Sequence, residues 1–103
     1  MKNSLSASCI QGILRSTKPY HSNHLKVFLA SSSSFAVGFS VGRWCGSAVE
    51  RNRFKRQSRE IVKSFYLSKK PVHVLIQTKK KIKEINNLKN EILSILQSSK
   101  VGL

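Results

Sequence analysis

The sequence predicts a small α+β domain, a two-layer sandwich with helices on one side of a small sheet, in the order helix, strand, strand, helix, strand, helix. Apolar residues alternate with other residues over 24–30, 35–41 and 72–78, a period of two that is typical of strands. Over 47–65 and from Ile82 to Leu96 they recur every three or four positions, which indicates amphipathic helices. A chain of 103 residues has room for one such domain.

The charge balance indicates an anionic partner. The chain has 19 Lys and Arg against 4 acidic residues, a net charge of +15, and residues 1–49 contain neither Asp nor Glu. This balance is typical of proteins that bind nucleic acid or an anionic membrane surface. Hydrophobic residues make up 40% of the chain, enough for a modest core. No segment approaches the roughly 20 apolar residues of a membrane span.

Residues 1–8 are polar and rich in Ser, and we expect them to be a flexible N-terminus that precedes one domain over 9–100. The absence of an apolar core before Cys9 argues against a signal peptide, and an organellar transit peptide is a less favoured alternative. Residues 8–17 predict a short helix with Ile10, Ile13 and Leu14 on one side, although Gly12 weakens it.

The first two strands are predicted on either side of four serines. Lys18 to Tyr20 reads as a turn, residues 24–30 as a strand, and the serines at 31–34 as a short hairpin connection to a strand over 35–41. The second strand has one apolar face and one face of small residues, Ala36, Gly38 and Ser40. The small residues would leave a shallow, open sheet surface along which a single strand could lie.

The central helix carries its own start signal. Ser47 and Glu50 form the S-x-x-E pattern of a capping box, and no Pro or Gly follows until Pro71, so about five turns are expected. Phe54, Ser58, Ile61 and Phe65 form an apolar stripe, with Val62 beside them.

A different face of this helix is basic. Like charges one turn apart cost roughly 0.2–0.5 kcal/mol per pair, and cations near a helix N-terminus oppose the macrodipole, so a bound polyanion would relieve both costs. A merely solvated charged face is the plain alternative. Arg suits phosphates and base edges better than Lys, and an Asn within the cluster can pair with a base or ribose. The stripe consists of Asn52, Arg56, Arg59 and Lys63, with Lys55 beside it and Arg51 and Arg53 on the first turn.

After a boundary at Lys69 to Pro71, a strand is predicted over 72–78 and a solvated basic turn over 79–83. A last helix from Ile82, with an apolar stripe of Ile85, Leu88, Ile92, Ile95 and Leu96, is expected to cover the sheet.

Catalytic chemistry within the protein is not expected. There are four carboxylates and no pair at a useful spacing. Cys9 and Cys45 with three scattered histidines show no zinc-binding spacing, so free thiols are the preferred interpretation.

Three blocks of the sequence resemble the bacterial ribonuclease P protein subunit: Val37 to Val41, Gly46 to Arg56, and Arg59-Glu60. The family signature R-N-R/K-x-K/R-R-x-x-R, preceded by G-x-A-V-x, stands without a gap over Gly46 to Arg59. The resemblance implies a ribosomal protein S5 domain 2-like fold with a left-handed strand–helix–strand crossover. It also implies an accessory subunit of an endoribonuclease, whose RNA partner removes the 5′ leader of precursor tRNA.

The resemblance implies further properties of the complex. The protein would be a monomer bound 1:1 to ribonuclease P RNA in the bacterial cytoplasm, with no membrane partner. Mg²⁺ would act at the RNA–protein complex, and no side-chain cluster of the protein would hold a metal. The RNA-binding residues would be Arg43, Arg51, Asn52, Arg53, Lys55, Arg56, Arg59 and Lys63.

The resemblance also implies a cleft for the leader, with Phe28, Ile10, Leu14 and Ser40 as its residues. The family carries two cleft aromatics four residues apart, where this chain has Ile10 and Leu14, and aliphatic side chains cannot stack on a base. Phe28 as a plain core residue is the alternative to a leader contact. Trp44, where the family has a Lys, could stack on a base or sugar or pack against the main helix, and we favour packing.

Two other functions fit the residues. A small basic ribosomal or RNA-assembly protein could use the same helix on structured RNA. A basic amphipathic helix can also lie on anionic lipid, although the Asn within the Arg cluster and aromatics suited to a core argue against it.

Overall fold

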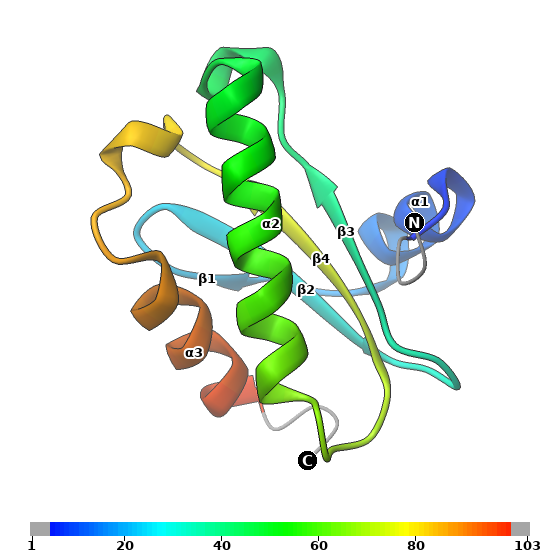
Figure 1. The fold of residues 1–103 in the computed structure, drawn as a ribbon. Coiled ribbons are helices and arrows are strands. Elements are labelled where there is room, and N and C mark those ends of the chain that lie inside the picture. The colour runs from blue at the N-terminus through cyan, green and yellow to red at the C-terminus, as the bar shows by residue number, and fades with distance from the viewer. Residues whose placement is uncertain (1–4, 100–103) are drawn as a thin grey trace.

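A computed structural model describes residues 5–99 and confirms the predicted α+β architecture (Figure 1). Four strands form one sheet, and three α-helices and two short 3₁₀ helices complete the fold. In chain order these are α1 (Ala7–Ser16), β1 (Tyr20–His21), β2 (Leu25–Ser31), β3 (Ala36–Ser40), η1 (Arg43–Cys45), α2 (Ala48–Phe65), β4 (Val72–Thr78), η2 (Ile82–Glu84) and α3 (Leu88–Ser99).

The strands are ordered β1-β2-β4-β3, so the predicted hairpin between the first two long strands is wrong. Strand β4 lies between them, antiparallel to β2 and parallel to β3. The physical reason is that β4 is apolar on both faces: Val74 and Leu75 are both fully buried, and burial on two sides requires a central strand. The sequence predicts a turn at residues 18–20, whereas the structure has the two-residue strand β1 beginning at Tyr20.

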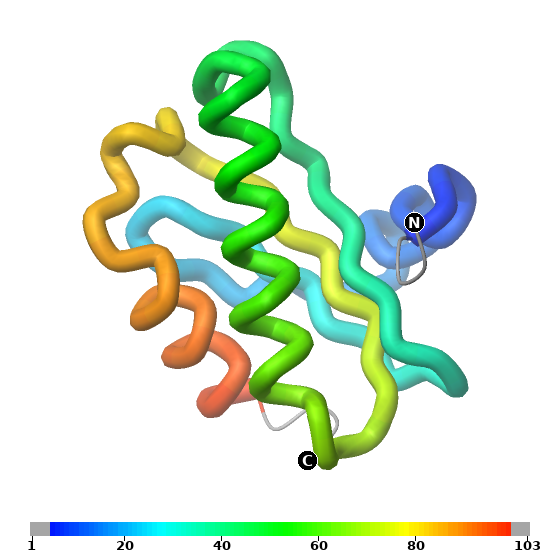
Figure 2. Tube along the Cα trace, viewed as in Figure 1, coloured from blue at the N-terminus to red at the C-terminus, as the bar shows by residue number. Residues whose placement is uncertain are grey.

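Helices cover both faces of the sheet. Helices α2 and α3 lie on one face and enclose the main core, which includes Leu25, Val27, Val74, Ile92 and Leu96. On the other face, a smaller cluster joins Ile13 of α1 to Phe28 and Leu75. In Figure 2, α1, in blue, lies to the right of β3, away from α2 and α3. The prediction of helices on one side therefore holds for α2 and α3 but not for α1.

The path from β3 through α2 to β4 has an uncommon hand. In Figure 1 both strands run upward, α2 descends in front of the sheet, and the chain passes from β3 to β4 on its left. This is a left-handed crossover, the rare sense for parallel strands, and the one that the family resemblance implied.

Local signals set the helix boundaries. The capping box of α2 is confirmed: Ser47 Oγ accepts from the N–H of Glu50 at 3.1 Å, and Glu50 Oε1 accepts from the N–H of Ser47 at 2.9 Å. Ser6 caps α1, so this helix begins inside the segment expected to be flexible, while residues 1–4 lie outside the described part. The last helix begins at Leu88 rather than Ile82, because Asn87 Oδ1 accepts from the N–H of Asn90 and starts a new helix there.

No helix within residues 5–99 is both long and apolar enough to cross a membrane.

Candidate nucleic-acid interface

One exposed face of α2 is basic. At about 100° per residue, five of the predicted RNA-binding side chains fall within an arc of about 100° on the helix surface. They are Asn52, Lys55, Arg56, Arg59 and Lys63. Four of them, together with Glu60, line a surface hollow of about 380 Å³. The structure therefore brings these five residues together on one face, as the helical spacing predicted.

Arg59 is held more firmly than its neighbours. Its guanidinium carbon lies 5.3 Å from the centre of the Phe39 ring on β3, and Phe39 meets Phe54 of the core edge-on at 6.1 Å. Its Nε is buried and has no hydrogen-bond partner among the described residues. The cation is thus positioned by stacking at the edge of the sheet before any ligand arrives.

The cations of this face form no salt bridge among the described residues. Within residues 5–99, no carboxylate lies within 4.0 Å of a charged nitrogen of α2. Glu50 is engaged in the helix cap, where the Ser47 N–H lowers the pKa of its carboxyl. Some desolvation opposes this shift, and the Ser47 hydroxyl, Lys83 and Arg53 add to it. With four cations against Glu60, the face consequently presents a net positive charge, which suits a chain of phosphates.

The other three predicted RNA-binding residues lie near the N-terminal end of α2 or in the preceding turn η1. Arg51 is turned inward, and its Nε donates to the carbonyl of Gly46 at 3.2 Å, so it ties the helix to the preceding turn. Arg53 is exposed on the side of α2 that faces η2, beside Glu50 and Lys83. Arg43 is exposed in η1. The structure does not place these three within the arc of the other five.

Of the residues predicted for the leader cleft, some are covered in the fold and others are exposed. Phe28 is only 4% exposed, in the cluster beneath α1 against which Ile10 also packs. Leu14 is exposed on α1, and Ser40 is exposed at the end of β3. The sheet face of small residues, expected to be open, is covered at Gly38: a Cβ there would lie 2.9 Å from Leu5 Cδ1. That expectation is therefore wrong at Gly38.

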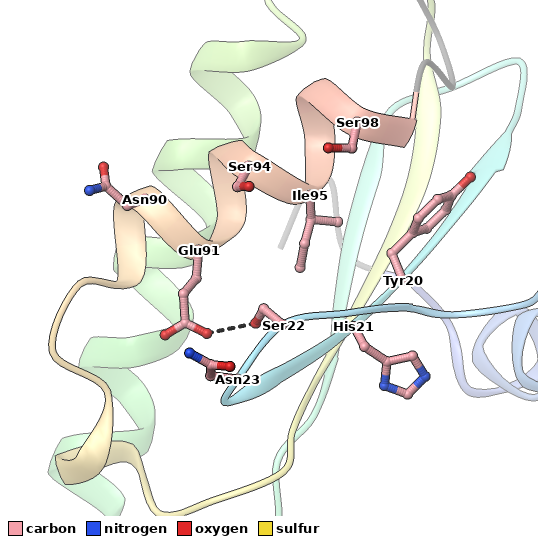
Figure 3. Close-up of a pocket in the computed structure, with 9 residues that line it drawn as sticks. All are labelled: Tyr20, His21, Ser22, Asn23, Asn90, Glu91, Ser94, Ile95 and Ser98. Carbon is pink, nitrogen blue, oxygen red and sulfur yellow. Dashed lines mark hydrogen bonds between the residues drawn. The ribbon is translucent and has the colours of Figure 1, made fainter.

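A second hollow, of about 500 Å³, lies between the turn after β1 and helix α3 (Figure 3). At its edge Glu91 accepts from Ser22 Oγ at 2.6 Å and from the N–H of His24 at 3.1 Å, and its Oε2 lies 2.8 Å from His24 Nδ1. Partial burial raises the pKa of Glu91, but these bonds outweigh it and lower the pKa below its usual value. This anchor has no signal in the sequence, because its partners lie far apart in the chain.

The cysteines are free thiols, as predicted. Cys9 is exposed, and the buried Cys45 donates from Sγ to the carbonyl of Gly42 at 2.7 Å. Among residues 5–99, no three His, Cys, Asp or Glu side chains gather into a group that could hold a metal ion.

Comparison with known proteins agrees with this architecture. A model of the ribonuclease P family matches residues 3–98. The ribonuclease P protein component of Finegoldia magna is 48% identical over 44 residues, which are 43% of this chain and 39% of that relative.

Solved structures share the fold. The ribonuclease P protein of Staphylococcus aureus superposes with a TM-score of 0.86 at 20% identity over the whole of both chains. That of Thermotoga maritima gives a TM-score of 0.77 at 20% identity, covering 94% of this chain and 97% of the other. Because the family model spans nearly the whole sequence, the chain belongs to the ribonuclease P protein family.

Proposed function

We propose that this chain is the protein subunit of a ribonuclease P ribonucleoprotein. It binds the catalytic RNA and precursor tRNA, and it promotes removal of the 5′ leader by that RNA. The observation that carries this proposal is the exposed basic face of α2, whose cations have no carboxylate within 4.0 Å among residues 5–99. The protein acts as a monomer, 1:1 with its RNA, in the bacterial cytoplasm.

The contribution of the protein is electrostatic. Two RNAs that must pack together repel each other through their phosphates, and cations between them lower that repulsion and release bound counterions. Arg59 stacks on Phe39, and Asn52, Lys55 and Arg56 line the same hollow. A phosphate backbone that follows α2 meets these donors in succession. Tighter packing of substrate against the catalytic RNA then raises the cleavage rate when little divalent cation is available.

Mg²⁺ is an ion of the RNA in this proposal. The described residues do not gather a metal-binding group, and the carboxylates of Glu50 and Glu91 are engaged in the helix cap and in the anchor to Ser22 and His24. Within the complex Mg²⁺ supplies the activation of water and the stabilisation of the leaving oxygen. The basic face favours the folded, closely packed state of the RNA, and this is the state that binds the ion.

The leader contact is the second part of the proposal. A leader strand that passes along the sheet face meets the exposed Ser40 and Leu14 directly. The ring of Phe28 is buried, and Leu5 and Ile10 pack against its cluster. Stacking of a leader base on Phe28 therefore requires these two side chains to move aside.

Cleavage of precursor tRNA tests both parts. A bacterial ribonuclease P RNA is assayed at low Mg²⁺, with and without the protein, on substrates with leaders of one nucleotide and of about eight nucleotides. We expect the protein to restore cleavage, and more strongly for the long leader. Restoration independent of leader length would refute the leader contact and keep the RNA-binding face. No restoration, together with tight binding to other structured RNA, would favour a ribosomal or assembly role.

A further inference from the structure

Trp44 is the one exposed aromatic side chain of the protein. All eight Phe, Tyr and Trp residues lie within the described range, and the other seven are buried or half-buried. Trp44 is 57% exposed, in the 3₁₀ turn η1 that joins β3 to α2. The preference for packing against the main helix, stated from the sequence, is therefore wrong.

The turn that carries Trp44 is anchored to the core. Cys45 is almost fully buried, and both its thiol and its N–H donate to the carbonyl of Gly42, at 2.7 and 3.2 Å. The indole lies close against Gly42, because a Cβ on Gly42 would meet Trp44 Cδ1 at 2.7 Å and Nε1 at 2.9 Å. The ring thus lies with its Cδ1–Nε1 edge against Gly42, while more than half of the side chain is exposed.

Cations lie close to Trp44 in the chain. Arg43, in the same turn, is exposed, and α2 begins three residues after η1 with its own run of cations. The nearby acid, Glu50, is engaged by the N–H of Ser47. An exposed aromatic ring that follows an exposed Arg in the same turn suits one nucleotide, whose base can stack while its phosphate meets the guanidinium.

A protein partner fits this site less well. Val49 is the other large apolar side chain exposed near the start of α2. Two side chains provide far less than the roughly 800 Å² per partner of a specific protein interface. An isolated ring beside a cation is instead the arrangement that binds unpaired bases.

We propose that Trp44 stacks on an unpaired base of bound RNA while Arg43 contacts an adjoining phosphate. This inference rests on the proposed function, since it needs an RNA partner. It adds a contact for unpaired nucleotides at the N-terminal end of α2, separate from the phosphate contacts of the basic face.

The chain contains a single Trp, so emission excited beyond the absorption of its two Tyr residues reports on this ring alone. The probes are two fluorescein-labelled RNA hairpins of equal length, one fully paired and one with a bulge of unpaired nucleotides. Anisotropy of the label measures binding, and Trp emission at matched saturation measures stacking. We expect both hairpins to bind and the bulged hairpin to quench the emission more strongly.

Substitutions separate stacking from charge. Trp44→Ala should weaken binding of the bulged hairpin about tenfold and binding of the paired hairpin less than twofold, and Trp44→Phe should retain most of the affinity. Gly42→Ala should displace the ring and reduce quenching, with the far-ultraviolet circular dichroism unchanged. Leu67→Ala, at an exposed apolar residue elsewhere, is the matched control and should change neither measurement.

Three results would overturn the inference. The first is binding of the bulged hairpin without additional quenching. The second is an equal loss of affinity for both hairpins in Trp44→Ala. The third is quenching by anionic lipid vesicles but not by RNA, which would assign the ring to a membrane surface. Failure of the unaltered protein to bind either hairpin would refute the proposed function itself, and the inference with it.

Discussion

Replacing Ser58 by Ala should stabilise the protein, although the substitution removes atoms from a buried position. Ser58 lies at the centre of the buried face of α2, one turn from Phe54 and one turn from Val62. It is 0% exposed, and its hydroxyl has no hydrogen-bond partner among the described residues. The folded state therefore carries a polar group that has lost its hydration and gained no partner.

The expected gain follows from three terms. A buried hydroxyl without a partner costs about 1–3 kcal/mol relative to water. Ala is also preferred over Ser inside a helix, by up to about 0.5 kcal/mol. Against these, a void the size of one oxygen, on the order of 10 Å³, costs about 0.2 kcal/mol. We expect a net stabilisation of at least about 1 kcal/mol, which would raise the Tm of a domain of this size by about 4–8 °C.

Urea unfolding followed by far-ultraviolet circular dichroism measures this change. The midpoint of Ser58→Ala should rise while the m-value stays constant. Ser94→Ala, at an exposed position inside α3, is the matched control, because it changes helix propensity without changing a buried hydroxyl. A midpoint that falls in Ser58→Ala while that of Ser94→Ala stays the same or rises slightly would show that the Ser58 hydroxyl has a bonding partner in solution, and would refute the reasoning.

Two other stability predictions concern side-chain anchors. Ser47→Ala removes the side-chain acceptor at the start of α2 and should lower the free energy of unfolding by about 1 kcal/mol in the same urea assay; an unchanged midpoint would mean that the cap is not needed. Glu91 has a lowered pKa in the folded state, so its stabilising effect is complete above its ordinary value of 4.5 and is lost as the pH falls through the lowered value. Glu91→Gln should therefore reduce Tm at neutral pH and flatten its decline between about pH 5 and pH 3. If Tm falls equally with pH in Glu91→Gln and in the unaltered protein over this range, the stabilising role of the Glu91 carboxylate is contradicted.

Local features of this fold could be predicted from the sequence. The start of α2 follows from Ser47 and Glu50, which need only each other and the intervening backbone. The alternation of Val37 and Phe39 against Gly38 identifies a strand, and the spacing of Arg56 and Arg59 identifies an exposed helix face. These signals depend on the period of one element, and periodicity is retained in a single sequence.

Features that depend on distant partners could not be predicted. The place of β4 between β2 and β3 depends on which strands pair, and alternation does not encode a partner. Leu5 covers Gly38 from far along the chain, so the small sheet face looked open. The anchoring of Glu91 by Ser22 and His24 could not be predicted for the same reason, because these partners lie far apart in the chain. The exposure of Trp44 follows from the anchored turn around Gly42, which has no periodic signal.

The most direct test of the central claim, that the basic face of α2 binds RNA, is the salt dependence of RNA affinity. Each phosphate contact contributes about 0.9 or less to the slope of log K against log salt, so Arg56→Ala with Lys63→Ala should flatten the slope by up to about 1.8. Lys70→Ala with Lys80→Ala removes the same charge from exposed positions outside the face and should leave the slope nearly unchanged. Equal flattening in the two pairs, or an unchanged slope in the first, would contradict the account.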